Sequence, residues 1–100
     1  MAFGINKAEL ERWKADVSRG HIAFLTHFWY DPGLPDITTV TKVGCADFER
    51  LTDWCRKHGL NPAYIHRRDH FPHFDLLGKA QMEVLKTEGL WEHIRRFGIS

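Results

Sequence analysis

The fold of this chain is decided by one apolar stretch, Ile22-Ala23-Phe24-Leu25-Thr26-His27-Phe28-Trp29-Tyr30. Its apolar side chains fall at both even and odd positions, so both faces of an extended backbone would be apolar. This pattern predicts a strand that is covered on both sides. Turn residues fill 31–36, and the β-branched residues of 38–43 predict a second strand that pairs with the first as a wide-looped hairpin.

Helical patterns flank this hairpin. Asn6 followed by Glu9 resembles the capping box that begins a helix, and Gly20 supplies its end. A second helix is predicted over 46–58 from its apolar stripe.

Residues 63–66 and 73–76 predict two short strands joined by a six-residue loop, and two further helices complete the chain. We therefore predict the α+β class with the element order α-β-β-α-β-β-α-α. In this fold the helices pack on a mostly antiparallel sheet.

Length and composition limit the function. One hundred residues suffice for one core, so we expect 1–100 to form a single small domain. A net charge of +1 lacks the basic excess of a dedicated nucleic-acid-binding protein. The first residues lack the long apolar core of a signal peptide, and no stretch approaches the length of a membrane span. We expect a cytoplasmic protein with no membrane partner.

The densest chemistry lies in one segment, Ile65-His66-Arg67-Arg68-Asp69-His70-Phe71-Pro72-His73-Phe74-Asp75-Leu76. It holds three of the seven histidines, two adjacent arginines and two aspartates. Imidazoles and carboxylates bind transition metals and transfer protons near neutral pH, and paired arginines hold phosphate.

Strand alternation sorts this segment into two faces. If the two short strands pair with His66 opposite His73, Tyr64 lies opposite Asp75. One face then carries the core residues Ile65, Phe74 and Leu76, and the other carries Tyr64, His66, His73 and Asp75.

Three interpretations of the polar face stay open. The candidate catalytic residues are His66, His73 and Asp75, and the same three are the candidate ligands of a divalent metal ion. A histidine and a carboxylate could instead transfer protons without a metal. In the third interpretation the two histidines flank a solvent-facing hairpin and Asp75 caps the following helix.

The loop between the short strands is a candidate anion site. Arg67 and Arg68 could clamp a phosphate, with His70 nearby and with Tyr64 or Phe71 stacked on a base. This favours a phosphate-bearing ligand or a nucleic acid as partner. The alternative is a solvated surface loop.

Two residues of the first strand are further candidates for ligand binding. His27 stands among apolar neighbours, and Asp31 follows where the strand ends. Both could join the polar face if this strand neighbours the later hairpin. Otherwise His27 is a hydrogen-bonded core residue. His93, on the last helix, is expected at the surface.

The two cysteines form neither a metal motif nor a disulfide framework. Cys45 follows Gly44 at a strand-to-helix junction, where a helix N-terminus could lower its pKa and make it a nucleophile; the alternative is a buried structural thiol. Cys55 lies on an apolar stripe and is expected in the core.

Several segments resemble the YneQ-type family of small bacilli proteins: 1–5, 22–27, 39–45, 65–66 and 72–76. The likeness spans nearly the whole chain. More loosely, the second half resembles a wider bacterial and phage domain in which a His-aromatic-Asp tripeptide precedes a final helix, here His73-Phe74-Asp75. The resemblance implies a bacterial, cytoplasmic protein and adds weight to His73 and Asp75. It implies no activity.

Three classes of function follow from these observations. The first is a binding module for a phosphorylated small molecule or a nucleic acid. The second is a small metal-dependent or acid-base hydrolase that uses the histidine and aspartate residues. The third is an interaction domain or homodimer, because four tryptophans and seven phenylalanines are many for this length and any left exposed would suggest an interface.

Overall fold

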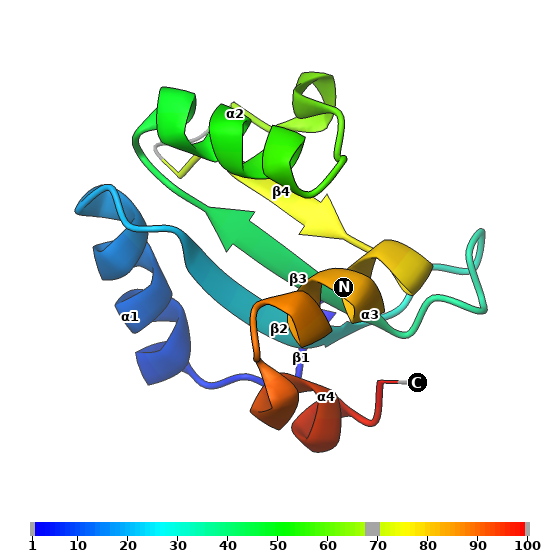
Figure 1. Ribbon diagram of the computed structural model, residues 1–100. Helices are drawn as coiled ribbons and strands as arrows, with labels where there is room; N and C mark the ends of the chain where they lie inside the picture. The colour runs from blue at the N-terminus through cyan, green and yellow to red at the C-terminus, as the bar shows by residue number, and fades with distance from the viewer. Residues whose placement is uncertain (1, 68–70, 100) are drawn as a thin grey trace. The chain divides into compact units, whose positions relative to one another are not determined.

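The two stretches predicted to be extended form strands β2 (Ala23–Trp29) and β3 (Thr39–Gly44). The computed structural model describes residues 2–67 and 71–99. The remaining elements, in chain order, are β1 (Ala2–Phe3), α1 (Lys7–Ser18), α2 (Phe48–Lys57), the 3-10 helix η1 (Pro62–Tyr64), β4 (His73–Leu76), α3 (Gly78–Thr87) and α4 (Trp91–Phe97) (Figure 1). The strands are hydrogen-bonded in the order β1-β2-β3-β4. The α+β class with an antiparallel sheet is confirmed.

The chain divides into two compact units by its internal packing. Of the described residues, the first unit holds 2–5, 26–41 and 76–99, and the second holds 6–25, 42–67 and 71–75. The single domain over 1–100 stays a prediction.

In the first unit the short strand β1 extends the sheet. It pairs antiparallel with β2, with Phe3 opposite Phe28. The Phe97 ring of α4 meets the Phe28 ring edge-on, with centroids 4.9 Å apart. Gly4 makes this packing feasible, because its φ is +88° and a Cβ there would lie 2.5 Å from the Phe28 ring. Strand β1 was not predicted, because a strand of two residues is too short to show a period.

In the second unit α1 begins as the sequence predicts. The side chain of Asn6 accepts a hydrogen bond from the backbone N–H of Glu9 at 2.8 Å. Trp13 and Val17 of α1 pack against Gly44 of β3, where a Cβ would lie 2.6 Å and 2.7 Å from their side chains. The missing side chain of Gly44 therefore lets the helix approach the strand closely.

The strand predicted over 63–66 is wrong. Asn61 caps the backbone N–H of Ala63 with its side chain at 3.0 Å, and Pro62 occupies the first turn of η1. The backbone N–H of Tyr64 then donates to the carbonyl of Asn61, which closes the 3-10 turn. Asn-Pro therefore overrides the apolar alternation that suggested a strand. Among the described residues of this segment, one isolated bridge remains, between His66 and His73.

The two cysteines are both buried. The thiol of Cys45 donates to the carbonyl of Gly20 at 3.3 Å, and burial raises its pKa. The buried thiol and its raised pKa favour the structural interpretation of Cys45 over the nucleophile interpretation, because a raised pKa disfavours the thiolate. Cys55 is 0% exposed, which confirms its core position, and burial raises its pKa to about 11. Within residues 2–67 and 71–99, no helix combines the length and the apolar character needed to cross a membrane.

Candidate metal site

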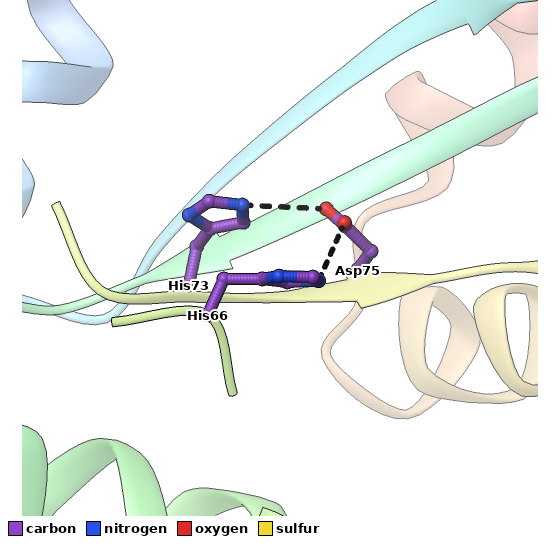
Figure 2. A group of neighbouring side chains, drawn as sticks. All are labelled: His66, His73 and Asp75. Carbon is purple, nitrogen blue, oxygen red and sulfur yellow. Dashed lines mark ion pairs between the residues drawn. The ribbon is translucent and has the colours of Figure 1, made fainter. Parts of the chain in front are cut away.

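The His–Asp cluster consists of His66, His73 and Asp75, all in the second unit (Figure 2). Ile65 directly follows η1, and its side chain is buried. This burial anchors the backbone next to His66. The backbones of His66 and His73 exchange two hydrogen bonds, of 2.8 Å and 3.1 Å. This is the predicted register, and it places the two imidazole rings in a stack with centroids 5.1 Å apart.

Alternation along β4 adds the carboxylate to the same face. His73 and Asp75 are two residues apart, so their side chains leave the strand on one side. Phe74 and Leu76 point the other way and are buried, as predicted. Nε2 of His66 lies 3.3 Å from Oδ2 of Asp75, and Nε2 of His73 lies 3.8 Å from Oδ1. Both imidazoles therefore turn the same nitrogen toward one carboxylate.

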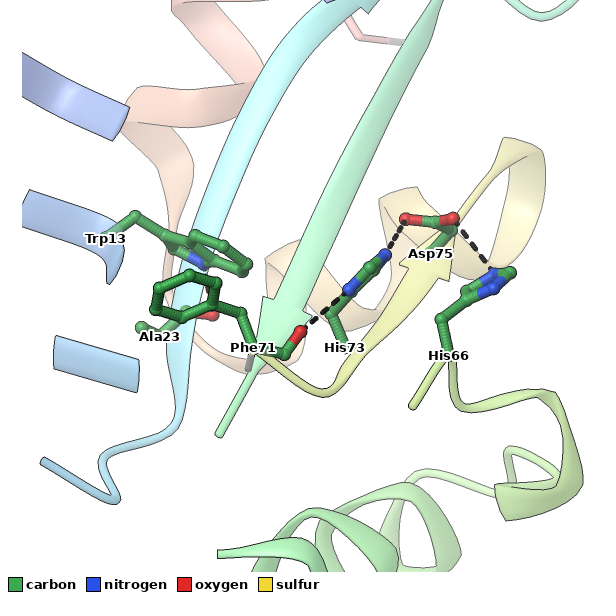
Figure 3. Close-up of polar contacts among 6 residues, drawn as sticks. All are labelled: Trp13, Ala23, His66, Phe71, His73 and Asp75. Carbon is green, nitrogen blue, oxygen red and sulfur yellow. Dashed lines mark hydrogen bonds and ion pairs between the residues drawn. The ribbon is translucent and has the colours of Figure 1, made fainter. Parts of the chain in front are cut away.

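The other nitrogen of His73 fixes its tautomer. Nδ1 lies 3.0 Å from the backbone carbonyl of Phe71 (Figure 3). A carbonyl oxygen only accepts, so Nδ1 carries the hydrogen and a neutral His73 has its lone pair on Nε2. That lone pair faces Oδ1 of Asp75, a buried oxygen that has no hydrogen-bond partner among the described residues. Two acceptors thus face each other, an arrangement that a proton or another cation between them would stabilise.

Aromatic side chains support this geometry from behind. The Trp13 ring packs edge-on against the His73 ring, with centroids 6.3 Å apart, and at a tilt against the Phe71 ring, with centroids 6.2 Å apart. Its indole N–H donates to the carbonyl of Ala23 at 3.1 Å, which holds the ring in place. The side chains of His73 and His66 are 15% and 54% exposed. The cluster is therefore backed by packed rings and reaches solvent at His66.

The structure excludes the interpretation in which Asp75 caps the following helix. Leu77 is the N-cap of α3, and that cap makes no side-chain hydrogen bond. Asp75 instead faces the two histidines. The carboxylate therefore belongs to the His–Asp cluster.

Comparison with known proteins places the chain in a family. It is 52% identical over 97 residues to the Uncharacterized protein YneQ of Bacillus subtilis (strain 168), and the match covers 97% of this chain and 98% of that protein. The chain belongs to the YneQ family. No family model and no solved structure matches the chain.

The predicted position of Tyr64 in this YneQ-family chain is wrong. It stands on η1, 69% exposed, and not on a strand opposite Asp75. The turn that begins at Asn61 removes it from the strand alternation, so it does not share the face of the His–Asp cluster.

His27 and Asp31 lie in the first unit. His27 is buried in β2, and its Nδ1 donates to the carbonyl of Phe28 at 2.9 Å. Asp31 accepts a hydrogen bond from the backbone N–H of Gly33 at 2.8 Å, which stabilises the turn after β2. The one potential metal group found among the described residues contains neither of them. Their part in ligand binding stays a prediction.

The candidate anion loop is only partly described. Arg67 is exposed, and its guanidinium carbon lies 3.8 Å from the centroid of the Phe48 ring, in cation–π geometry. Arg68 and His70, which were predicted to bind the same ligand, lie outside the described residues. The predicted phosphate clamp therefore rests on Arg67 alone in the described part of the chain.

Two features of the site were not predicted from the sequence. Nothing in the local sequence pattern around Trp13 shows that its ring supports His73. The carbonyl of Phe71 that holds His73 is a backbone group and carries no sequence signal. Pro72, which follows Phe71, is the local sequence signal for a rigid backbone at this point.

Proposed function

We propose that this YneQ-family protein binds a divalent transition-metal ion at the His–Asp cluster. The observation that carries the proposal is the opposition of two acceptors, Nε2 of His73 and Oδ1 of Asp75, at 3.8 Å. A metal ion between them would accept electron pairs from both. The Nδ1 hydrogen bond to the Phe71 carbonyl is the contact that metal-bound histidines commonly make, because it fixes the ring and its tautomer.

The distances within the cluster suit a small ion. Ligand atoms about 2.0–2.2 Å from Zn²⁺ in tetrahedral geometry are about 3.3–3.6 Å from each other. The two nitrogen–oxygen distances are 3.3 Å and 3.8 Å, and all three ligand atoms lie within 4.8 Å of one another. Closure around an ion therefore requires side-chain shifts of about an ångström.

The ligand types select the class of ion. Two imidazoles with one carboxylate suit Zn²⁺ and its neighbours in the first transition row, whereas Mg²⁺ and Ca²⁺ prefer oxygen ligands alone. Three protein ligands leave at least one coordination position for water or substrate. Because the side chain of His66 is 54% exposed, that position would be reachable from solvent.

Metal-dependent hydrolysis is the second candidate function, and the open coordination position favours it. A bound ion would lower the pKa of its water and supply a nucleophile. Acid-base catalysis without a metal is less well supported at His73, because its Nδ1 is held by Phe71 and its Nε2 faces Asp75. A substrate could bind only Nε2 of His73, and the Asp75 carboxylate lies beside that atom.

Two further proposals, phosphate or nucleic-acid binding and a protein interface, have weaker support than metal binding. Phosphate or nucleic-acid binding is supported in the described chain by Arg67, which stacks on Phe48 and can still donate from its edge. A protein interface is supported by the exposed large side chains Phe3, Tyr30, Leu34, Tyr64 and Trp91. Salt-dependent binding of an oligonucleotide pool and light scattering test these two proposals.

Calorimetric titration of tag-free protein tests the metal proposal. The protein is stripped with a chelator, exchanged into metal-free buffer and titrated with Zn²⁺ at pH 7.5. We expect one ion per chain, and we expect His66→Ala and His73→Ala to weaken binding at least 100-fold. His21→Ala is the matched control, since His21 is exposed and lies outside the cluster. Equal affinity in all three variants, or no saturable binding, would refute the proposal.

A further inference from the structure

A chain of hydrogen bonds joins five polar side chains of the first unit, none of which belongs to the His–Asp cluster. Its four links run from Thr39 to Gln81 at 3.0 Å, from Gln81 to Thr41 at 3.1 Å, from Thr41 to Thr26 at 2.7 Å and from Thr26 to His93 at 2.8 Å. Thr26, Thr41 and Gln81 are at most 2% exposed.

His93 was predicted at the surface, and the structure shows it only partly exposed. Its Nδ1 bonds the Thr26 hydroxyl across 67 positions of sequence. His93 and Phe97 are four residues apart on α4, so they share the helix face that Phe97 buries. His93 is therefore the polar contact between α4 and β2.

The donors of the chain define its direction. The Thr39 hydroxyl donates to Oε1 of Gln81, and the Gln81 amide donates to the Thr41 oxygen. Among the described residues, Thr26 is then the one acceptor for the Thr41 hydrogen. Thr26 in turn directs its own hydrogen to Nδ1 of His93. Each hydroxyl thus donates once, and His93 ends the chain as an acceptor.

A proton on Nδ1 of His93 conflicts with this direction. Two donors would then face each other at the Thr26–His93 contact. Reversing the direction of every hydrogen bond in the series would require the Gln81 amide to rotate by half a turn. The Thr39 hydroxyl would then accept from Gln81, and its own hydrogen would need a new acceptor. Both residues are buried, at 2% and 7% exposure, so reversal would leave a buried donor without an acceptor.

The surroundings of His93 favour the neutral ring. Burial lowers its pKa, while Glu92 raises it and Arg96 lowers it to smaller extents. Thr26 on β2 contacts His93 directly, and Thr41 on β3 and Gln81 on α3 follow it in the series of hydrogen bonds. None of these three side chains carries a charge. Arg96 also donates to the carbonyl of Gly4 at 3.0 Å. The series of hydrogen bonds contains no carboxylate that could offset a positive charge on His93.

We propose that His93 is a proton-sensitive latch for α4. With Nδ1 unprotonated, the ring ends the hydrogen-bond chain and holds the helix against Thr26. Protonation in mildly acidic solution breaks this contact and releases α4 locally. The latch lies within the first unit and the His–Asp cluster within the second, so a failure of metal binding would not contradict the latch.

Nitrogen NMR of the histidine rings tests the starting state. In protein labelled with ¹⁵N-histidine at pH 7.5, we expect His93 to carry its hydrogen on Nε2 and to show Nδ1 as an acceptor. A neutral His93 with the hydrogen on Nδ1 would overturn the proposal, because the chain would then run in the opposite direction.

Amide hydrogen exchange of α4 tests the release. After correction for intrinsic rates, exchange within 94–97 should rise by up to about tenfold for each pH unit below about 6.5. His93→Asn keeps an acceptor near the Nδ1 position and does not titrate, so its corrected exchange should stay flat. His21→Asn, an exposed control, should keep the rise. An equal rise in His93→Asn and in wild type would overturn the proposal.

Thr26→Val supplies a second variant. It removes the donor that holds His93, so exchange in α4 should be fast already at pH 7.5 and should depend little on pH. An unchanged exchange profile in Thr26→Val would contradict the latch. The tautomer measurement on wild-type protein decides the question even if this core variant fails to fold.

Discussion

Nε2 of His66 lies 3.3 Å from Oδ2 of Asp75, while the second oxygen of that carboxylate faces His73. One carboxylate therefore serves both imidazoles, and it is the group on which the proposed metal site depends most.

Asp75→Asn tests this dependence. The amide keeps the shape of the side chain and removes its charge, so we expect Zn²⁺ affinity to fall at least 100-fold with the fold intact. Calorimetry measures the affinity, and circular dichroism checks the fold. Asp53→Asn is the control, because Asp53 is an exposed carboxylate on α2 outside the cluster. Equal loss of affinity in both variants would contradict the assignment.

Gly44→Ala tests the support behind the cluster. The new methyl group would lie 2.6 Å from the Trp13 ring and 2.7 Å from Val17. We expect the free energy of unfolding to fall by about 1–3 kcal/mol, because an overpacked core must shift. Urea denaturation measures the loss.

Gly33→Ala is the matched control for Gly44→Ala. It is exposed, and its nearest contact is the Asp31 side chain at 3.3 Å. We expect a change of about 0.5 kcal/mol or less. If both variants lost the same stability, the close packing of α1 on Gly44 would not matter.

The cysteines should be unreactive in the folded protein. Burial raises the pKa of both thiols, that of Cys55 to about 11. At pH 8 about one Cys55 side chain in a thousand would be a thiolate, so alkylation by iodoacetamide should be at least 100-fold slower than in urea. Mass spectrometry of the peptides measures each rate. Rapid labelling of Cys45 in folded protein would restore its role as a nucleophile.

Global stability should depend on His93 in a defined direction. Its pKa is lowered in the folded state, so the unfolded chain binds more protons below about pH 6.5. Its contribution is complete above that pH and is lost as pH falls through the lowered pKa, by at most about 1.4 kcal/mol per pH unit. Urea denaturation from pH 7.5 to 5 measures the slope. A slope in His93→Asn as steep as in wild type would contradict this assignment.

Local patterns predicted the main elements of this fold. The apolar run at 22–30, the Asn6 cap and the helical stripes act over a few residues, and β2, α1 and α2 follow them. Strand β1 was missed because its pairing with β2 joins residues far apart in the sequence. The 3-10 helix was missed because Asn61 and Pro62 outweighed an apolar alternation that also fits a strand.

The same contrast between local patterns and contacts of distant residues explains which parts of the candidate site could be predicted. His66, His73 and Asp75 could be predicted together because a six-residue loop with a single bridge and a period of two fix their relation locally. The Trp13 support and the Thr26–His93 contact could not, since each joins side chains separated by tens of residues. Such contacts depend on how the elements pack, which no single segment encodes.

The central claim is metal binding through Nε2 of His66 and His73. Long-range ¹H–¹⁵N NMR spectra of ¹⁵N-histidine-labelled protein, recorded at pH 7.5 before and after one equivalent of Zn²⁺, test it most directly. We predict that the Nε2 signals of both rings move to metal-bound values while Nδ1 of His73 keeps its hydrogen. Unchanged Nε2 signals of His66 and His73 at saturating Zn²⁺ would contradict the claim.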